Sequence, residues 1–257
     1  MIEGGEISSK KFGTDLFSKI LDLAIRKNID LAYAPCTSIA ARDEDLRNAD
    51  ILEKACGYVH NDMPTVFNIE ELLSNYLPKD VRDGMAASDI HQDSKANLYV
   101  ALALARLKLE LAHRERDMPS TNNQPVAIVS NGGSGLYILT SQPEQTLFVP
   151  AVTGVHVVDT TGAGDNLTAG AFVKATQLAN MHRNFKPGVR QQLSDNELAQ
   201  IAQFAQKVAV LAIEQQGACV DQDKLLQLLK DDAPVPVRAN MQGIEKIGAI
   251  REAQRAV

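Results

Sequence analysis

Cysteine is scarce in this sequence. The three cysteines, Cys36, Cys56 and Cys219, are odd in number and widely spaced, which argues against a disulfide framework or a zinc site. The five histidines are scattered singly, which favours surface or core positions over metal ligation. No apolar run approaches the roughly 20 residues of a membrane-spanning helix, and residues 1–6 lack the basic start and apolar core of a secretory signal. These absences predict a cytoplasmic protein.

The sequence also lacks an excess of positive charge. Its formal net charge is −6 at pH 7 and its Lys and Arg residues form no block, so nucleic acid and anionic membrane surfaces are not expected partners. A small anionic ligand needs only a local positive site. The 257 residues, 45% hydrophobic and 23% charged, are typical of a soluble globular protein and suffice for one α/β domain over 1–257.

Apolar residues recur at helical spacing in several segments, and short apolar runs between them are typical of buried strands. A helix over 12–25 followed by a strand over 29–34 is the step expected of a parallel sheet. The pattern further predicts helices at 95–114, 167–178 and 195–213, a strand at 125–130, and a strand that ends at 157–158 before the glycine turn. It also predicts a hairpin arm at 136–139, a loop at 185–194, and Gly217 as the C-cap of the last of these helices.

The stretch from Val157 to Phe172 combines an apolar strand end, a glycine turn and a helix start. Small residues in the turn let backbone amides point to one place, and the helix begins with unpaired N–H donors and its positive dipole end. This pattern predicts an anion site that suits a phosphate. Asp165 lies at its mouth, where a carboxylate either caps the helix or accepts a proton.

The run from Asp159 to Asp165, with Ala169-Gly170-Ala171-Phe172 on the next helical turn, resembles the C-terminal signature of the PfkB (ribokinase-like) family of carbohydrate and nucleoside kinases. The resemblance implies an α/β protein with the three-layer α/β/α ribokinase-like fold around a mostly parallel sheet. It implies a reaction in which ATP phosphorylates a hydroxymethyl group of a sugar or nucleoside.

Roles for the motif residues follow from the same resemblance. The aspartate that matches Asp165 takes the proton from the substrate hydroxyl. The amides of Gly162, Ala163 and Gly164 hold charge on the phosphoryl group in transit. Asp159 and Thr161 are expected to form a monovalent-cation loop together with residues of the Gly-Ala turn at 217–218, with K⁺ as the candidate ion.

Asn68-Ile69-Glu70-Glu71 resembles a second family motif, Asn-x-x-Glu. The resemblance implies that Asn68 and Glu71 act on Mg²⁺, largely through water, and on the phosphates. Because Mg²⁺ keeps several waters, Glu71 suffices as an outer anchor. The alternative is that Asn68 is only the N-cap of a helix with glutamates in its first turn.

A glycine turn from Ser130 to Gly135 resembles the family's Thr-x-Gly-x-x-Gly turn, with Ser in place of Thr. The resemblance implies that Ser130, Gly132 and Gly135 line the nucleotide, whereas the alternative is an ordinary hairpin. The Ala-rich helix and Gly-Ala turn after it also resemble the family. This resemblance implies that Gln206, Val210 and Gly217 face the adenine.

The resemblance covers 12–229 and only the C-terminal two-thirds of the family pattern, while the tail at 232–257 shows no chemistry. Strands that carry the family's substrate motif, lid and substrate-gripping aspartate are not found before this part. We therefore expect slow transfer by the chain alone, and self-association or pairing with the missing segment through an uncovered sheet edge.

Two other functions remain open at this point. One is a catalytically inactive nucleotide-binding or scaffold protein derived from such a kinase. The other, a Rossmann dehydrogenase, is disfavoured because no G-x-G-x-x-G follows an early strand.

Overall fold

The computed structural model describes part of the chain. The described residues are 2–3, 19, 23, 33–34, 65–76, 98, 100–105, 126–140, 146–185, 193–231 and 245–246. Their elements are β1 (Ile2–Glu3), β2 (Tyr33–Ala34), β3 (Thr65–Asn68), α5 (Ile69–Tyr76), β4 (Val126–Ser130), η1 (Gly132–Ser134), β5 (Gly135–Thr140), β6 (Leu147–Pro150), α9 (Ala163–Phe185), α10 (Asp195–Ile213), α11 (Gln222–Asp231) and β7 (Glu245–Lys246).

The main sheet has five strands in the order β3-β4-β5-β6-β7. Strands β3 and β4 are parallel, and each later pair is antiparallel. A separate parallel pair joins β1 to β2, and β2 lies beside β3. The sheet is thus mixed, with its parallel part at the β3 side. From the predicted tail, residues 245–246 add the outer strand β7.

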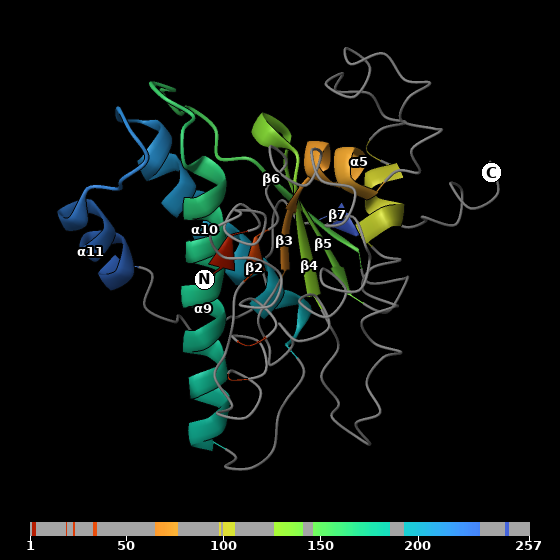
Figure 1. Ribbon diagram of the computed structural model, residues 1–257. Helices are drawn as coiled ribbons and strands as arrows, with labels where there is room; N and C mark the ends of the chain where they lie inside the picture. Colours follow the sequence, from red (N-terminus) through yellow and green to blue (C-terminus); the bar gives the residue numbers. More distant parts are fainter. Residues whose placement is uncertain are drawn as a thin grey trace.

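Helices cover both faces of this sheet (Figure 1). Two long helices, α9 and α10, lie on one face, and α5 with the helical residues 100–105 lies on the other. Strand β5 is buried along its whole length, as expected of a strand covered on both faces. The layered α/β arrangement predicted from the sequence is therefore observed.

Aliphatic and aromatic side chains from these three layers fill one core. The strands are rich in the β-branched and aromatic residues that pack well on a pleated surface. The largest fully buried side chains are Phe67, Phe204, Leu72, Leu73, Leu102, Ile128, Ile138, Leu139, Leu147 and Ile201.

Several sequence predictions are confirmed within the described residues. The helix at 195–213 has the predicted ends, and 126–140 forms the predicted hairpin. The predicted helix at 12–25 is represented by helical residues 19 and 23, and the predicted strand at 29–34 by 33–34. The remaining residues of these two segments, and most of the predicted helix at 95–114, lie outside the described residues.

Three predictions are wrong. No strand forms at 157–158, because β6 ends at Pro150 and the amide of Val158 donates to the Ile213 carbonyl at 2.8 Å instead of to a strand neighbour. Phe185 belongs to α9 rather than to a loop. The C-cap of α10 is Glu214, and Gly217, with φ of +87°, lies in the turn beyond it.

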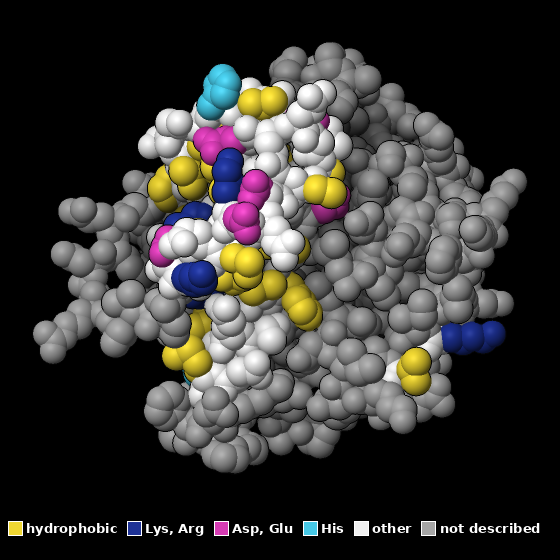
Figure 2. Space-filling view, turned by 90° about the vertical axis from the view of Figure 1, so that its left-hand side faces the viewer, with side chains coloured by type: hydrophobic (Ala, Val, Ile, Leu, Met, Phe, Trp, Pro, Cys, Tyr) yellow, Lys and Arg dark blue, Asp and Glu magenta, His cyan; other side chains and the backbone are white. Residues whose placement is uncertain are grey.

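On the face turned toward the viewer in Figure 2, acidic and basic side chains of the described residues are interspersed with apolar ones. This mixture agrees with the absence of a Lys and Arg block in the sequence. Within the described residues, no helix combines the length and apolar character that crossing a membrane requires.

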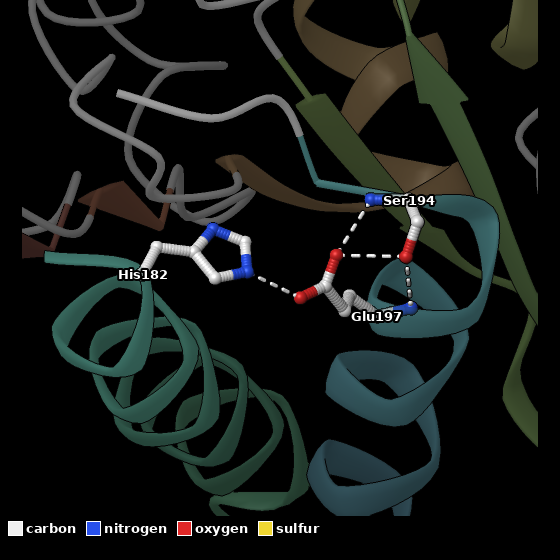
Figure 3. A network of polar contacts seen from close by, with 3 residues as sticks. All are labelled: His182, Ser194 and Glu197. Carbon is white, nitrogen blue, oxygen red and sulfur yellow. Dashed lines mark hydrogen bonds and ion pairs between the residues drawn. The ribbon is translucent and has the colours of Figure 1, made fainter. Parts of the chain in front are cut away.

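A polar network joins the end of α9 to the start of α10 (Figure 3). The Ser194 hydroxyl accepts a hydrogen bond from the Glu197 amide. The Glu197 carboxylate in turn accepts one from the Ser194 amide at 2.8 Å, which completes a capping box. The same carboxylate lies 2.6 Å from Nε2 of His182. Burial opposes ionisation of Glu197, but its hydrogen bonds to Ser194 and then His182 prevail and lower its pKa.

We expect Glu197→Gln to lower the free energy of unfolding at neutral pH, because glutamine keeps the capping box but loses the charge that faces His182. A lowered folded-state pKa means that the carboxylate stabilises the fold above the unfolded-state pKa. This contribution begins to decline when the pH falls below 4.5, the ordinary pKa of a glutamate, and it is lost once the pH has fallen through the lower folded-state pKa. Urea unfolding of both proteins across this range would show a difference that shrinks with acid. A stability difference that does not change with pH would contradict a lowered pKa of Glu197.

Candidate active site

The glycine turn opens α9 in the predicted way. Gly162 has φ of +75°, and its carbonyl accepts the backbone amide of Asn166 at 2.9 Å. The helix begins at Ala163, so Asp165 is its third residue and not its N-cap. The side chain of Asp165 is exposed. This geometry leaves the carboxylate at the positive end of a 23-residue helix.

The first amides of α9 are available as donors. Among the described residues, no acceptor is bonded to the backbone amides of Gly162, Gly164 and Asp165. The amide of Ala163 differs, because it donates to the Thr160 carbonyl at 3.2 Å. Three of the first four amides around the turn can therefore face an anion together with the helix dipole.

Asp159 fixes the turn from its other side. Its two carboxylate oxygens accept the amide of Thr161 at 2.9 Å and the amide of Gly217 at 3.0 Å. Hydrogen bonds from Thr161, and then from Gly217, lower the pKa of Asp159 against a small opposing effect of burial. The ionised carboxylate therefore connects the turn that precedes α9 to the turn that follows α10. These are the two segments predicted to form a cation loop.

The same two turns are in close contact at Gly162. A Cβ atom on Gly162 would lie 2.6 Å from Cβ and 2.9 Å from Cα of Ala218. These distances are shorter than any ordinary contact, so glycine is required here by both its conformation and its neighbour.

Asn68 and Ser130 lie at the carboxyl ends of the parallel strands β3 and β4 and pair with each other in register. Oδ1 of Asn68 accepts the Glu70 amide at 2.8 Å, so Asn68 does cap α5. Glu71 lies in the first turn of that helix. The two predicted polar segments are therefore brought to one edge of the sheet.

Gly135 and Gln206 meet at the carbonyl of Val149. A Cβ atom on Gly135, whose φ is +129°, would lie 2.4 Å from this oxygen. Nε2 of Gln206 donates to the same oxygen at 3.3 Å, and Gln206 is buried. Its amide thus fastens α10 to the end of β6, and Val210 is partly buried one turn further along.

The start of α9, the short η1 helix that contains Gly132, and the start of α5 lie at the same end of the molecule, toward the top of Figure 1. The structure thus gathers the three predicted motifs at one edge. The hydrogen bond from the Asn166 side chain to the Ala218 carbonyl was not predicted from the sequence. The position of Asn166 directly after Asp165 is the only local signal for it.

Metal-ligating side chains are few in this region. Within the described part of the chain, His, Cys, Asp and Glu do not gather in groups of three that could hold a metal ion. A Mg²⁺ ion that arrives with a nucleotide keeps most of its water and needs only one or two carboxylates, so this finding does not bear on such an ion.

Comparison with known structures supports the fold. The chain is similar to adenosine kinase from Schistosoma mansoni (16% identity, TM-score 0.53, 87% of this chain and 52% of that chain covered). It is also similar to ribokinase from Giardia lamblia (18%, 0.53, 86% and 56%) and to a putative ribokinase II from E. coli (14%, 0.53, 90% and 57%). The predicted ribokinase-like α/β fold is confirmed, and the chain spans a little over half the length of these relatives.

Comparison with family models gives a match at residues 95–225, just over half of the chain, to the pfkB family carbohydrate kinases. The matched region contains the glycine turn, Asp165 and both long helices. The chain therefore belongs to the pfkB family of carbohydrate kinases.

Proposed function

We propose that this chain transfers the γ-phosphoryl group of ATP to a hydroxymethyl group of a sugar or nucleoside, with Asp165 as the base. The observation that carries the proposal is the exposed Asp165 carboxylate beside amides of Gly162 and Gly164 that no described residue occupies. A base must be reachable by the acceptor hydroxyl, and the developing phosphoryl charge needs donors next to it.

The related structures indicate the candidate ligands. The Schistosoma enzyme is described in complex with adenosine and AMP, and the E. coli ribokinase II in complex with ATP and Mg²⁺. We infer that this chain uses ATP with Mg²⁺, and that its acceptor is a sugar or a nucleoside.

Bound ATP with Mg²⁺ would supply the transferable phosphoryl group and neutralise part of its charge. The chain's own residues then have two tasks. Asp165 accepts the proton of the attacking hydroxyl, and the amides of Gly162, Gly164 and Asp165, which have no acceptor among the described residues, donate to the phosphoryl oxygens. Phosphoryl transfer relies mainly on positioning and charge stabilisation, and these groups would supply part of both.

Other predicted residues receive roles on the nucleotide side. We assign water-mediated contacts to Mg²⁺ and phosphate to Asn68 and Glu71, because Asn68 pairs with Ser130 at the edge of the sheet and Glu71 lies in the first turn of the helix that begins there. The nucleotide itself would lie along Ser130, Gly132, Val210 and Gly217. Gly135 and Gln206 are buried, so their predicted contacts with it remain predictions. A K⁺ site near Asp159 and Thr161 remains a prediction, as does a homo-oligomer.

We expect the chain to bind ATP with Mg²⁺, since the segments assigned to the nucleotide are all present. Isothermal titration calorimetry at submillimolar to millimolar nucleotide would give a saturable heat. Adenosine alone is the matched control and should bind more weakly, because it lacks the phosphates that the amides of α9 would hold. No heat from a protein shown to be folded by circular dichroism would refute the proposal.

A further inference from the structure

The side-chain amide of Asn166 connects two segments that are 52 residues apart. Its Nδ2 donates to the Gly162 carbonyl at 2.8 Å and to the Ala218 carbonyl at 2.9 Å. Both N–H groups of one amide are thus used, one on each turn. Nothing in the chemistry assigned to Asp165 requires this side chain.

The two acceptors are the carbonyls that define the contact between the turns. Gly162 and Ala218 are packed so closely that no side-chain atom fits at Gly162. The Gly162 carbonyl also accepts the backbone amide of Asn166, so both of its lone pairs are directed at one residue. The orientation of this peptide unit determines where the amides that follow it point.

We propose that Asn166 is a positioning residue that holds the Gly162 turn against the Ala218 turn. It thereby keeps the amides of Gly164 and Asp165, and the Asp165 carboxylate, aimed at one point. This inference rests on the proposed phosphoryl transfer for its functional part, whereas the bridge between the turns is independent of it.

Asparagine suits this position better than its nearest relatives. Aspartate has the same shape but, when ionised, donates no hydrogen bond and places negative oxygen against two carbonyl oxygens. Serine is shorter and carries one donor, so it reaches at most one of the two carbonyls. A bridge that needs two donors on one short, planar group selects the carboxamide.

The test compares Asn166→Asp with Asn180→Asp, the same change at an exposed position of α9. Amide hydrogen exchange is read at Thr161 and Gly217, whose amides are bonded to Asp159 on the two turns. We expect Asn166→Asp to accelerate exchange at both amides together and Asn180→Asp to change neither. Unchanged exchange at either turn would overturn the bridge.

Kinetics test the functional part. We expect Asn166→Asp to lower kcat by ~10- to 100-fold, as for a small misplacement of reacting groups, and to change KM for ATP only a few-fold. A KM effect without a kcat effect would overturn the positioning role. Asn166→Ser, which retains one donor, is the second variant if Asn166→Asp does not fold, and its kcat should lie between those of the wild type and Asn166→Asp. Wild-type protein without transfer would contradict the proposed function, while the exchange result would still decide the bridge.

Discussion

Asp165→Asn is expected to lower kcat for phosphoryl transfer by about 10²- to 10⁴-fold, the usual contribution of a general base. The asparagine has the same size and stays at the third position of α9, but it cannot take the proton of the acceptor hydroxyl. Affinity for ATP should change little, because the amides that would hold the phosphates are unaltered. Initial rates at varied ATP would separate kcat from KM.

A matched control distinguishes a base from a charge that only favours the helix start. Asp223 lies in the first turn of α11 and is exposed, so Asp223→Asn removes the same kind of helix-dipole interaction away from the site. We expect this variant to retain wild-type kcat. If Asp165→Asn keeps more than a tenth of the wild-type kcat, Asp165 is not the base.

Gly162→Ala should damage both the site and the fold. The positive φ of Gly162 costs a residue with a side chain about 1–3 kcal/mol. The added methyl group would also meet Ala218 at 2.6 Å, which forces the two turns apart. We expect a clear loss in the free energy of unfolding, measured in urea, and loss of ATP binding measured by calorimetry.

Gly164→Ala is the matched control for stability, because a Cβ atom at Gly164 meets nothing within 4 Å and its backbone is helical. In a helix this change is neutral or stabilising by up to ~1 kcal/mol. Adding Ala218→Gly to Gly162→Ala removes the Cβ contact but not the contact with Cα, so we expect only partial recovery. Equal stability of Gly162→Ala and Gly164→Ala would show that the close contact has no energetic role.

Features encoded locally were predicted well from the sequence. The helix at 195–213 is defined by apolar periodicity, and the hairpin at 126–140 by a buried run, a glycine turn and a second run. The prediction of a strand that ends at 157–158 was wrong, because apolar residues before a glycine turn do not by themselves indicate strand pairing. Val157 and Val158 are exposed in the structure.

The individual hydrogen bonds between distant residues of the site were not predictable, although the family resemblance already placed Asp159 and the turn at Gly217 in one cation loop. The glycine turn and Asp165 follow from short-range geometry and from the family resemblance. The bridges from Asp159 to Gly217 and from Asn166 to Ala218 join residues 58 and 52 positions apart, and spacing in the sequence carries no sign of them. The roles given to the nucleotide-side residues remain predictions.

The most direct test of the account is transfer of a labelled γ-phosphoryl group from ATP to a panel of sugars and nucleosides, with products identified by mass spectrometry. The account predicts a phosphate ester on a hydroxymethyl group, formed with Mg²⁺ by the wild-type chain and at least tenfold more slowly by Asp165→Asn. Slow turnover of the wild type is compatible with this prediction, since the product, and not the rate, identifies the reaction. A folded chain that binds ATP yet forms no phosphate ester with any acceptor would contradict the kinase assignment and favour a nucleotide-binding protein without catalysis.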